Sequence, residues 1–170
     1  MLTYISNFAH YTTVLARVAA VKHTLWIGTA DIKDLYVKVG DGTLPFLAVL
    51  AQLVRKGVEV RLIHAKEPGP AFREDFDKYP SLAKGLERVL CPRVHFKMLV
   101  FDGGAVYFGS ANLTGAGIGM KSDQKRNFEA GILTDEPELV RQAMQQFDEV
   151  WMGLHCKRCL RRKYCGDPIA

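Results

Sequence analysis

The sequence predicts an α/β fold: a mixed, mostly parallel β-sheet flanked by helices on both faces, with a short cysteine-rich C-terminal tail. Runs of β-branched and aromatic residues alternate with longer segments whose apolar residues recur at helical spacing. The order strand, helix, strand over residues 24–63 is typical of a parallel crossover. A chain of 170 residues can form one domain with a sizeable core. We therefore expect a catalytic domain over residues 1–152 and a tail over residues 153–170.

Each expected element follows from a local pattern. Helices are expected over residues 7–22, 44–56 and 81–90, and from a capping box at residues 135–138 to residue 151. Gly57 should end the second helix, and Ser81 is a candidate N-cap for the third. Strands are expected over residues 24–29, 58–63, 94–101, 106–108 and 127–133. The segments 31–42 and 67–80 are predicted to be loops because turn residues and prolines interrupt them.

Composition and charge exclude some classes of protein. The longest apolar run, residues 44–54, is too short to span a bilayer, and no signal-peptide pattern opens the chain. We therefore expect a cytoplasmic protein without stable membrane insertion. The net charge of +5 favours an anionic partner, but five positive side chains lie between residues 157 and 163. Basicity therefore favours nucleic-acid binding mainly through the tail, and a merely solvated basic tail would explain the charge equally well.

The stretch from Val94 to Asn112 carries the chemistry. It reads H-x-K-x4-D-x6-G-S-x-N, with the polar positions His95, Lys97, Asp102, Ser110 and Asn112. His95 and Lys97 are two residues apart in a predicted strand, so both side chains point to the same face. An imidazole beside an ammonium suits an anion, because the ring can act as nucleophile or proton carrier while the lysine holds the negative charge. Ser110 and Asn112 follow the next strand as small hydrogen-bond donors.

This pattern resembles the signature of the phospholipase D superfamily at every position and with the same spacing. The resemblance implies that His95, Lys97, Ser110 and Asn112 are catalytic, with Asp102 in a supporting hydrogen-bonding role. Relatives carry a glutamate in an N-x-E strand after the signature, where it orients the catalytic histidine, and Glu129 matches that place. The alternatives are a half-buried strand with a histidine and a lysine on its solvent face, and a surface carboxylate at position 129.

Only one full signature is present. His64-Ala65-Lys66 repeats H-x-K, but Ala71 stands where the aspartate should be. Relatives with one motif complete the active site by forming a symmetric homodimer. The resemblance therefore implies that His95 of one subunit attacks the phosphodiester to give a phosphohistidine. His95 of the partner subunit would protonate the leaving oxygen and then activate water. Because the lysines supply positive charge, this chemistry needs no catalytic metal.

Small dimeric members with a single motif are typically nucleases. The resemblance therefore implies a metal-independent endonuclease that acts on DNA or RNA. One alternative is a phospholipid hydrolase or phosphatidyltransferase, which would need an apolar lipid-docking surface. The other is a non-catalytic nucleic-acid-binding module that kept the fold.

The tail contains C-x2-C-x5-C, formed by Cys156, Cys159 and Cys165, with His155 beside the first cysteine. This spacing is typical of a metal knuckle, and a disulfide is the weaker explanation in a protein that is not exported. The fourth ligand could be His155, Cys91 or a group from another chain. We expect a structural zinc, with an iron–sulfur cluster as the second choice and free thiols as the alternative.

Overall fold

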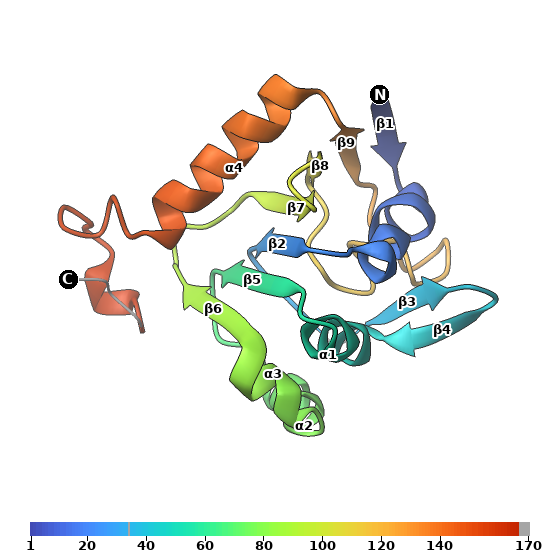
Figure 1. The fold of residues 1–170 in the computed structure, drawn as a ribbon, viewed down its shortest axis with the longest axis horizontal. Coiled ribbons are helices and arrows are strands. Elements are labelled where there is room, and N and C mark those ends of the chain that lie inside the picture. Colours follow the sequence, from blue (N-terminus) through green and yellow to red (C-terminus); the bar gives the residue numbers. More distant parts are fainter. Residues whose placement is uncertain (34, 167–170) are drawn as a thin grey trace.

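The computed structural model describes residues 1–33 and 35–166. Its centre is a seven-stranded sheet with the order β1-β9-β8-β7-β2-β5-β6 (Figure 1). In chain order, these strands are β1 (Leu2–Ser6), β2 (Thr24–Thr29), β5 (Glu59–His64), β6 (Leu86–Leu90), β7 (Lys97–Phe101), β8 (Ala105–Gly109) and β9 (Ala130–Thr134). A separate hairpin is formed by β3 (Tyr36–Val39) and β4 (Gly42–Pro45).

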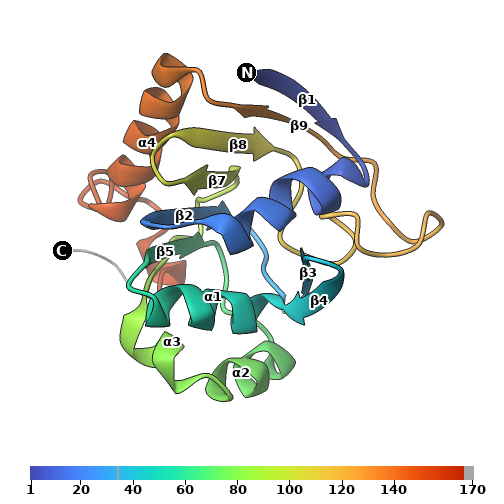
Figure 2. The same cartoon turned by 45° about the vertical axis from the view of Figure 1, so that its right-hand side comes forward.

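Helices cover both faces of the sheet (Figures 1 and 2). They are α1 (Phe46–Arg55), α2 (Pro70–Asp77), α3 (Pro80–Gly85) and α4 (Pro137–Trp151), with shorter coils η1 (His10–Val14), η2 (Leu15–Ala20) and η3 (Arg162–Tyr164). On one face, α4 buries Val140 and Phe147 against Trp26 and Met98. On the other face, η1, η2 and α1 enclose the larger core around Leu25, and their apolar stripes pack against it.

Strand directions confirm the predicted fold class. β1, β2, β5, β6 and β8 run one way, and β7 and β9 run the other. The sheet is therefore mixed, with most strands in one direction, as expected. The neighbouring pairs β2–β5 and β5–β6 are parallel, whereas the remaining neighbours are antiparallel. The predicted crossover through α1 joins β2 to β5.

The N-terminal segment differs from its prediction. The helix expected over residues 7–22 is confirmed only in part: residues 10–20 are helical, but η1 is a π-helix and η2 is a 3₁₀ helix. The run Thr12-Thr13-Val14 is β-branched, which disfavours a regular α-helix. The strand β1, which the sequence analysis missed, precedes them and pairs with β9. Asn7 adopts a left-handed backbone conformation, φ 46°, which turns the chain out of β1.

Two expected loops contain regular structure. The β3–β4 hairpin occupies most of segment 31–42, in which Asp34 lies outside the described residues, and turns at Gly40 with φ 57°. Segment 67–80 contains α2, which starts at Pro70 because proline suits the first helical turn. The helix expected over 81–90 stops at Gly85, and β6 follows it. A Cβ at Gly85 would lie 2.3 Å from Val54 Cγ1, so glycine permits close packing of α3 on α1.

The remaining elements lie near their expected positions. Gly57 ends α1 with φ 83°, as predicted, and α4 buries Val140 and Phe147. The capping box expected at residues 135–138 is wrong, because no side chain caps α4 and Asp135 binds the N-terminal ammonium of Met1. The strands expected at 94–101 and 127–133 begin later, at Lys97 and Ala130. His95 and Glu129 therefore stand just before strands β7 and β9, where side chains are freer to face a ligand.

Candidate active site

The ends of β2, β7, β8 and β9 lie side by side at one edge of the sheet, and this places residues of the signature close together. Lys97 at the start of β7 lies opposite Gly109 at the end of β8, and Gly109 lies opposite Gly131 in β9. On the other side, Gly28 pairs with Met98, which sets Thr29 beside Lys97. The residues just beyond these ends therefore converge from distant parts of the sequence: His95, Ser110 and Glu129.

The pair His95 and Lys97 forms the centre of the site. The His95 side chain is exposed, whereas Lys97 is only 6% exposed. Lys97 Nζ lies 3.3 Å from His95 Nδ1 and 3.4 Å from Nε2, and it donates to the His95 carbonyl at 2.7 Å. Within the described part of the chain, the ammonium forms no ion pair. Burial lowers the pKa of Lys97, and the nearby charge of Glu129 partly opposes this effect.

Ser110 and Glu129 are joined directly. The Ser110 hydroxyl donates to the Glu129 carboxylate, and Asn127 Nδ2 donates to the other carboxylate oxygen at 3.0 Å. The backbone N–H of Ala130 donates to Ser110 Oγ at 3.0 Å. Among the described residues, the Glu129 carboxylate therefore makes its hydrogen bonds to Ser110 and Asn127, and none to His95. That Glu129 orients His95 stays a prediction.

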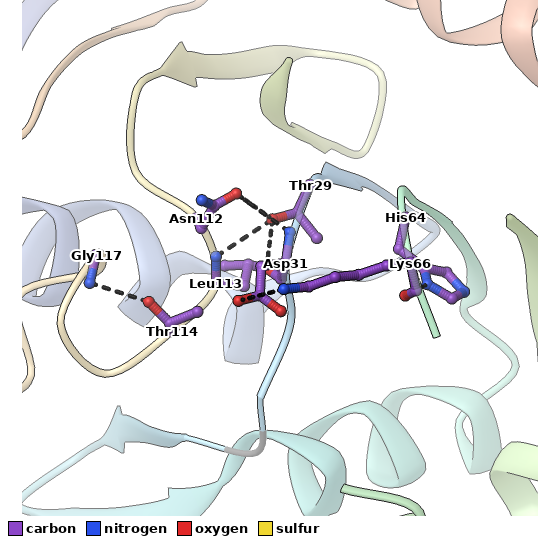
Figure 3. Close-up of polar contacts among 8 residues, drawn as sticks. All are labelled: Thr29, Asp31, His64, Lys66, Asn112, Leu113, Thr114 and Gly117. Carbon is purple, nitrogen blue, oxygen red and sulfur yellow. Dashed lines mark hydrogen bonds and ion pairs between the residues drawn. The ribbon is translucent and has the colours of Figure 1, made fainter. Parts of the chain in front are cut away.

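Asn112 is oriented by the segment that follows β2 (Figure 3). Its Oδ1 accepts from the Asp31 backbone N–H at 3.2 Å and from Thr29 Oγ1 at 3.4 Å. The buried Thr29 hydroxyl has one proton, which Asn112 Oδ1 and the Asp31 carbonyl at 2.8 Å share as acceptors, and its oxygen accepts from Leu113 N–H at 3.3 Å. Because protein donors occupy Oδ1, the amide NH₂ of Asn112 remains to donate to an anion. The sequence analysis missed Thr29, although a polar residue that ends a buried strand is a usable signal.

Asp102 lies at the opposite end of β7 from His95. Its carboxylate accepts backbone N–H groups of Lys22, His23 and Thr24 at 2.7–3.1 Å. Burial alone would raise the pKa of Asp102, but these hydrogen bonds outweigh it, and the pKa lies below its ordinary value. The carboxylate therefore fastens the start of β2 to the end of β7, away from the reacting groups.

A buried histidine that the sequence analysis missed lies beneath the site. His10 is fully buried in η1, and its ring meets Tyr107 edge-on with centroids 5.4 Å apart. Its Nδ1 lies 2.9 Å from the Asn7 carbonyl. Burial lowers the pKa of His10, against the opposing effects of that carbonyl and of Glu129. His10 belongs to no sequence motif, because its burial against Tyr107 arises only from the packing of η1 on the sheet.

Both polar side chains of the second H-x-K, at residues 64–66, contact neighbouring protein groups (Figure 3). His64 is fully buried at the end of β5, with Nδ1 2.7 Å from the Lys66 carbonyl, and burial lowers its pKa. Lys66 Nζ lies 3.4 Å from Asp31 Oδ2. Ala71 lies in α2, so no aspartate completes this motif. One signature therefore serves this chain.

The tail residues lie away from this site, beside the connection between β6 and β7. Cys91, Cys156 and Cys159 line two adjacent cavities, with His155 in one and Cys165 in the other. His155 Nε2 lies 3.4 Å from Glu149 Oε2. Among residues 1–33 and 35–166, no three histidine, cysteine, aspartate or glutamate side chains are already arranged to hold a metal ion.

Comparison with known proteins decides the family. Residues 15–151 match the family described as "Cardiolipin synthase, PLD-like domain". The chain belongs to the phospholipase D superfamily. The match spans the sheet from β2 to the end of α4, and the signature stands within it. No curated protein sequence matches this phospholipase D-like chain.

Solved structures share the phospholipase D-like fold at low sequence identity. NucT from Helicobacter pylori is 14% identical with a TM-score of 0.63, covering 88% of this chain and 95% of that one. Nuc from Salmonella typhimurium, a phospholipase D family member, is 16% identical with a TM-score of 0.65, covering 89% and 93%. TrmBL2, an archaeal chromatin protein with a novel mode of DNA binding, is 15% identical with a TM-score of 0.60, covering 89% and 52%. At such identities the likeness concerns the fold.

Proposed function

We propose that this phospholipase D-like protein is a metal-independent phosphodiesterase that cleaves nucleic acid. One observation carries the proposal: a buried ammonium, Lys97, has no carboxylate ion pair among the described residues and touches the exposed ring of His95. A buried, unpaired charge is costly unless a ligand neutralises it. An anion bound there would lie against a potential nucleophile, which suits a phosphodiester.

The reaction follows from these positions. His95 attacks phosphorus, and the P–O bond to the leaving group breaks as the P–N bond forms. His95 of the partner subunit gives its proton to the leaving oxygen. It then takes a proton from water, whose oxygen displaces the first His95 from phosphorus. Lys97 and the Asn112 amide bind the non-bridging oxygens, where negative charge accumulates, and Ser110 joins them when its hydroxyl turns from Glu129 to the phosphate.

Nucleic acid is the substrate class that the charge distribution favours. Exposed basic side chains gather in the tail, which starts where α4 ends: Lys157, Arg158, Arg161, Arg162 and Lys163. Such a cluster would bind successive phosphates of a polynucleotide and make binding depend on salt. TrmBL2, which shares the fold, binds DNA. The four free cysteines fit a reducing, cytoplasmic compartment.

A homodimer would complete the site. One chain carries one His95, whereas in-line displacement needs a nucleophile on one side of phosphorus and an acid on the other. A two-fold axis through the site supplies both from identical subunits. Phe128, beside Glu129, is 95% exposed, and a partner subunit at this edge would remove its ring from water.

Phe128→Asp is expected to convert the dimer into a monomer and to remove most of the phosphodiesterase activity. A charge placed in an apolar contact costs its desolvation, and the partner's histidine is then lost from the site. Light scattering coupled to size-exclusion chromatography measures the mass, and the same fractions are assayed for cleavage. Leu160→Asp is the matched control, because Leu160 is 94% exposed in the tail. A Phe128→Asp variant that stays dimeric would place the dimer contact elsewhere.

Thr29→Val is expected to lower kcat about fivefold, since roughly 1 kcal/mol of hydrogen bonding that holds Asn112 disappears. Valine keeps the shape of threonine but leaves the Leu113 N–H without its acceptor. Thr29→Ser restores the hydroxyl and should recover kcat. Thr29 acts as a positioning residue, so KM should change less than kcat. Equal kcat values for the valine and serine variants would show that the Thr29 hydroxyl does not position Asn112.

The proposed function is tested with labelled single-stranded and double-stranded DNA and RNA in excess EDTA. Cleavage of at least one polymer by the dimeric protein is expected. EDTA-treated protein is checked by circular dichroism, so that loss of a structural metal is not mistaken for loss of a catalytic one. A folded dimer that binds but does not cut would support a nucleic-acid-binding module instead. Activity that returns only with added Mg²⁺ would contradict the metal-independent mechanism.

A phospholipid is the second candidate substrate, because exposed apolar side chains accompany the basic ones in the tail. Met152, Leu154 and Leu160 are 70%, 68% and 94% exposed. Such a surface could lie on an anionic bilayer, although none of the described helices is long and apolar enough to cross one. Vesicles of phosphatidylglycerol form the matching arm of the assay. Headgroup release with no nucleic-acid cleavage would favour the lipid substrate.

A further inference from the structure

All four cysteines of the chain line one cavity beside the connection between β6 and β7. Cys91 follows β6 directly, whereas Cys156, Cys159 and Cys165 come from the tail after α4. The tail runs beside β6 (Figure 1). The Cys165 thiol donates to the carbonyl of Leu90, the residue before Cys91, at 3.7 Å. Folding therefore brings together thiols from two distant segments, with none left elsewhere in the sequence.

Local hydrogen bonds shape the backbone around Cys156 and Cys159, the C-x2-C pair of the tail. Cys159 N–H donates to the Cys156 carbonyl at 3.1 Å, which closes a turn between the two cysteines. The Arg161 N–H, two residues further on, donates to Cys159 Sγ at 3.4 Å. An N–H···S bond of this kind stabilises a thiolate and orients it as a ligand. On the other side, Cys91 N–H donates to the His64 carbonyl at 2.9 Å, which fixes Cys91 to the end of β5.

The charges around the cavity also suit a thiolate site. Four thiolates and one Zn²⁺ carry a net charge of about −2. The guanidinium-bearing residues Arg93, Arg161 and Arg162 line the same cavity and can balance that charge. His155 shares the neighbouring cavity with three of the cysteines, whereas Cys165 shares one cavity with the same three cysteines and with all three arginines, so Cys165 is the better placed fourth ligand.

We propose that Cys91, Cys156, Cys159 and Cys165 bind one structural zinc ion. The four cysteines line the cavity but do not already form a metal-binding cluster among the described residues, so their side chains must move to reach tetrahedral geometry. Cys91 precedes His95 by four residues. The zinc would therefore tie the tail to the connection that leads into the active-site strand. This site does not depend on the proposed nuclease activity.

The test is metal analysis of the full chain, expressed in zinc-supplemented medium and freed of any affinity tag. About one zinc per chain is expected by mass spectrometry, with four thiols protected from maleimide until the zinc is removed. Cys91→Ser and Cys165→Ser should lose most of the zinc, whereas His155→Ala should retain it. Co²⁺ loaded in place of zinc should show the absorption of a tetrahedral thiolate site, which reports the ligands even in a weakened variant.

Several results would overturn the proposal. Wild-type protein without bound metal and with four reactive thiols would remove the site. If Cys165→Ser retained zinc but His155→Ala lost it, the fourth ligand would be His155 and not Cys165. Zinc retained by Cys91→Ser would confine the ligands to the tail. Iron and sulfide, with visible absorption, would identify a cluster in place of zinc. Each readout is independent of catalysis, so an inactive protein can still confirm the zinc site.

Discussion

His95→Ala is expected to lower kcat/KM for phosphodiester cleavage by about 10⁴-fold or more, because loss of a catalytic nucleophile removes the covalent route. In the symmetric dimer, the same substitution removes the group that protonates the leaving oxygen. The exposed ring makes few packing contacts, so the variant should fold and unfold like the wild type. Thermal unfolding and cleavage are measured on the same preparation.

Trapping the intermediate tests the role of His95 directly. Acid is unsuitable as a quench, since a phosphoramidate bond is labile in acid. An alkaline denaturing quench is used instead. End-labelled oligonucleotide should then stay attached to the wild-type protein, and none should stay attached to the His95→Ala variant. His23→Ala is the matched control, because His23 is exposed at the opposite end of β2 and binds Asp102 only through its backbone. Full cleavage by His95→Ala would show that the reaction takes place at another site.

Lys97→Met is expected to lower kcat roughly 10²–10³-fold, the usual cost of removing one donor from the charge that develops in a transition state. Methionine fills the buried space of the lysine stem without its ammonium. The variant should be at least as stable as the wild type, because it removes a buried charge that has no carboxylate partner among the described residues. Steady-state kinetics and chemical unfolding together separate the catalytic effect from the structural one.

The pH dependence of kcat/KM checks the same residue. Burial lowers the pKa of Lys97, so the activating ammonium is lost as pH rises through a value below the ordinary lysine range. Lys97→Arg keeps its charge at any accessible pH. We therefore expect a slower enzyme whose alkaline limb moves to higher pH. Lys66→Met, in the second H-x-K, should leave both kcat and the alkaline limb unchanged, because Lys66 is exposed and paired with Asp31. If the alkaline limb of the Lys97→Arg profile did not move, a group other than Lys97 would be responsible for that limb.

Local patterns in the sequence predicted those elements whose intrinsic propensity matches the conformation that they adopt in the folded protein. Strand β2 is buried and rich in β-branched and aromatic residues, and α4 carries a continuous apolar stripe, so both were found. Strand β6 was missed because Leu86–Leu90 has no alternation of its own, and its pairing with β5 decides its conformation. The same holds for β1, whose partner β9 lies more than a hundred residues later.

The sequence by itself determined the fold class, the superfamily and the signature residues, because the spacing from His95 to Asn112 depends only on two neighbouring strands and the turn between them. Tertiary structure alone decided which groups surround that signature. Thr29 reaches Asn112, His10 reaches Tyr107, and Cys91 reaches the tail only after distant segments pack on the sheet. Local propensity carries no information about such contacts, since burial of the shared core brings these side chains together.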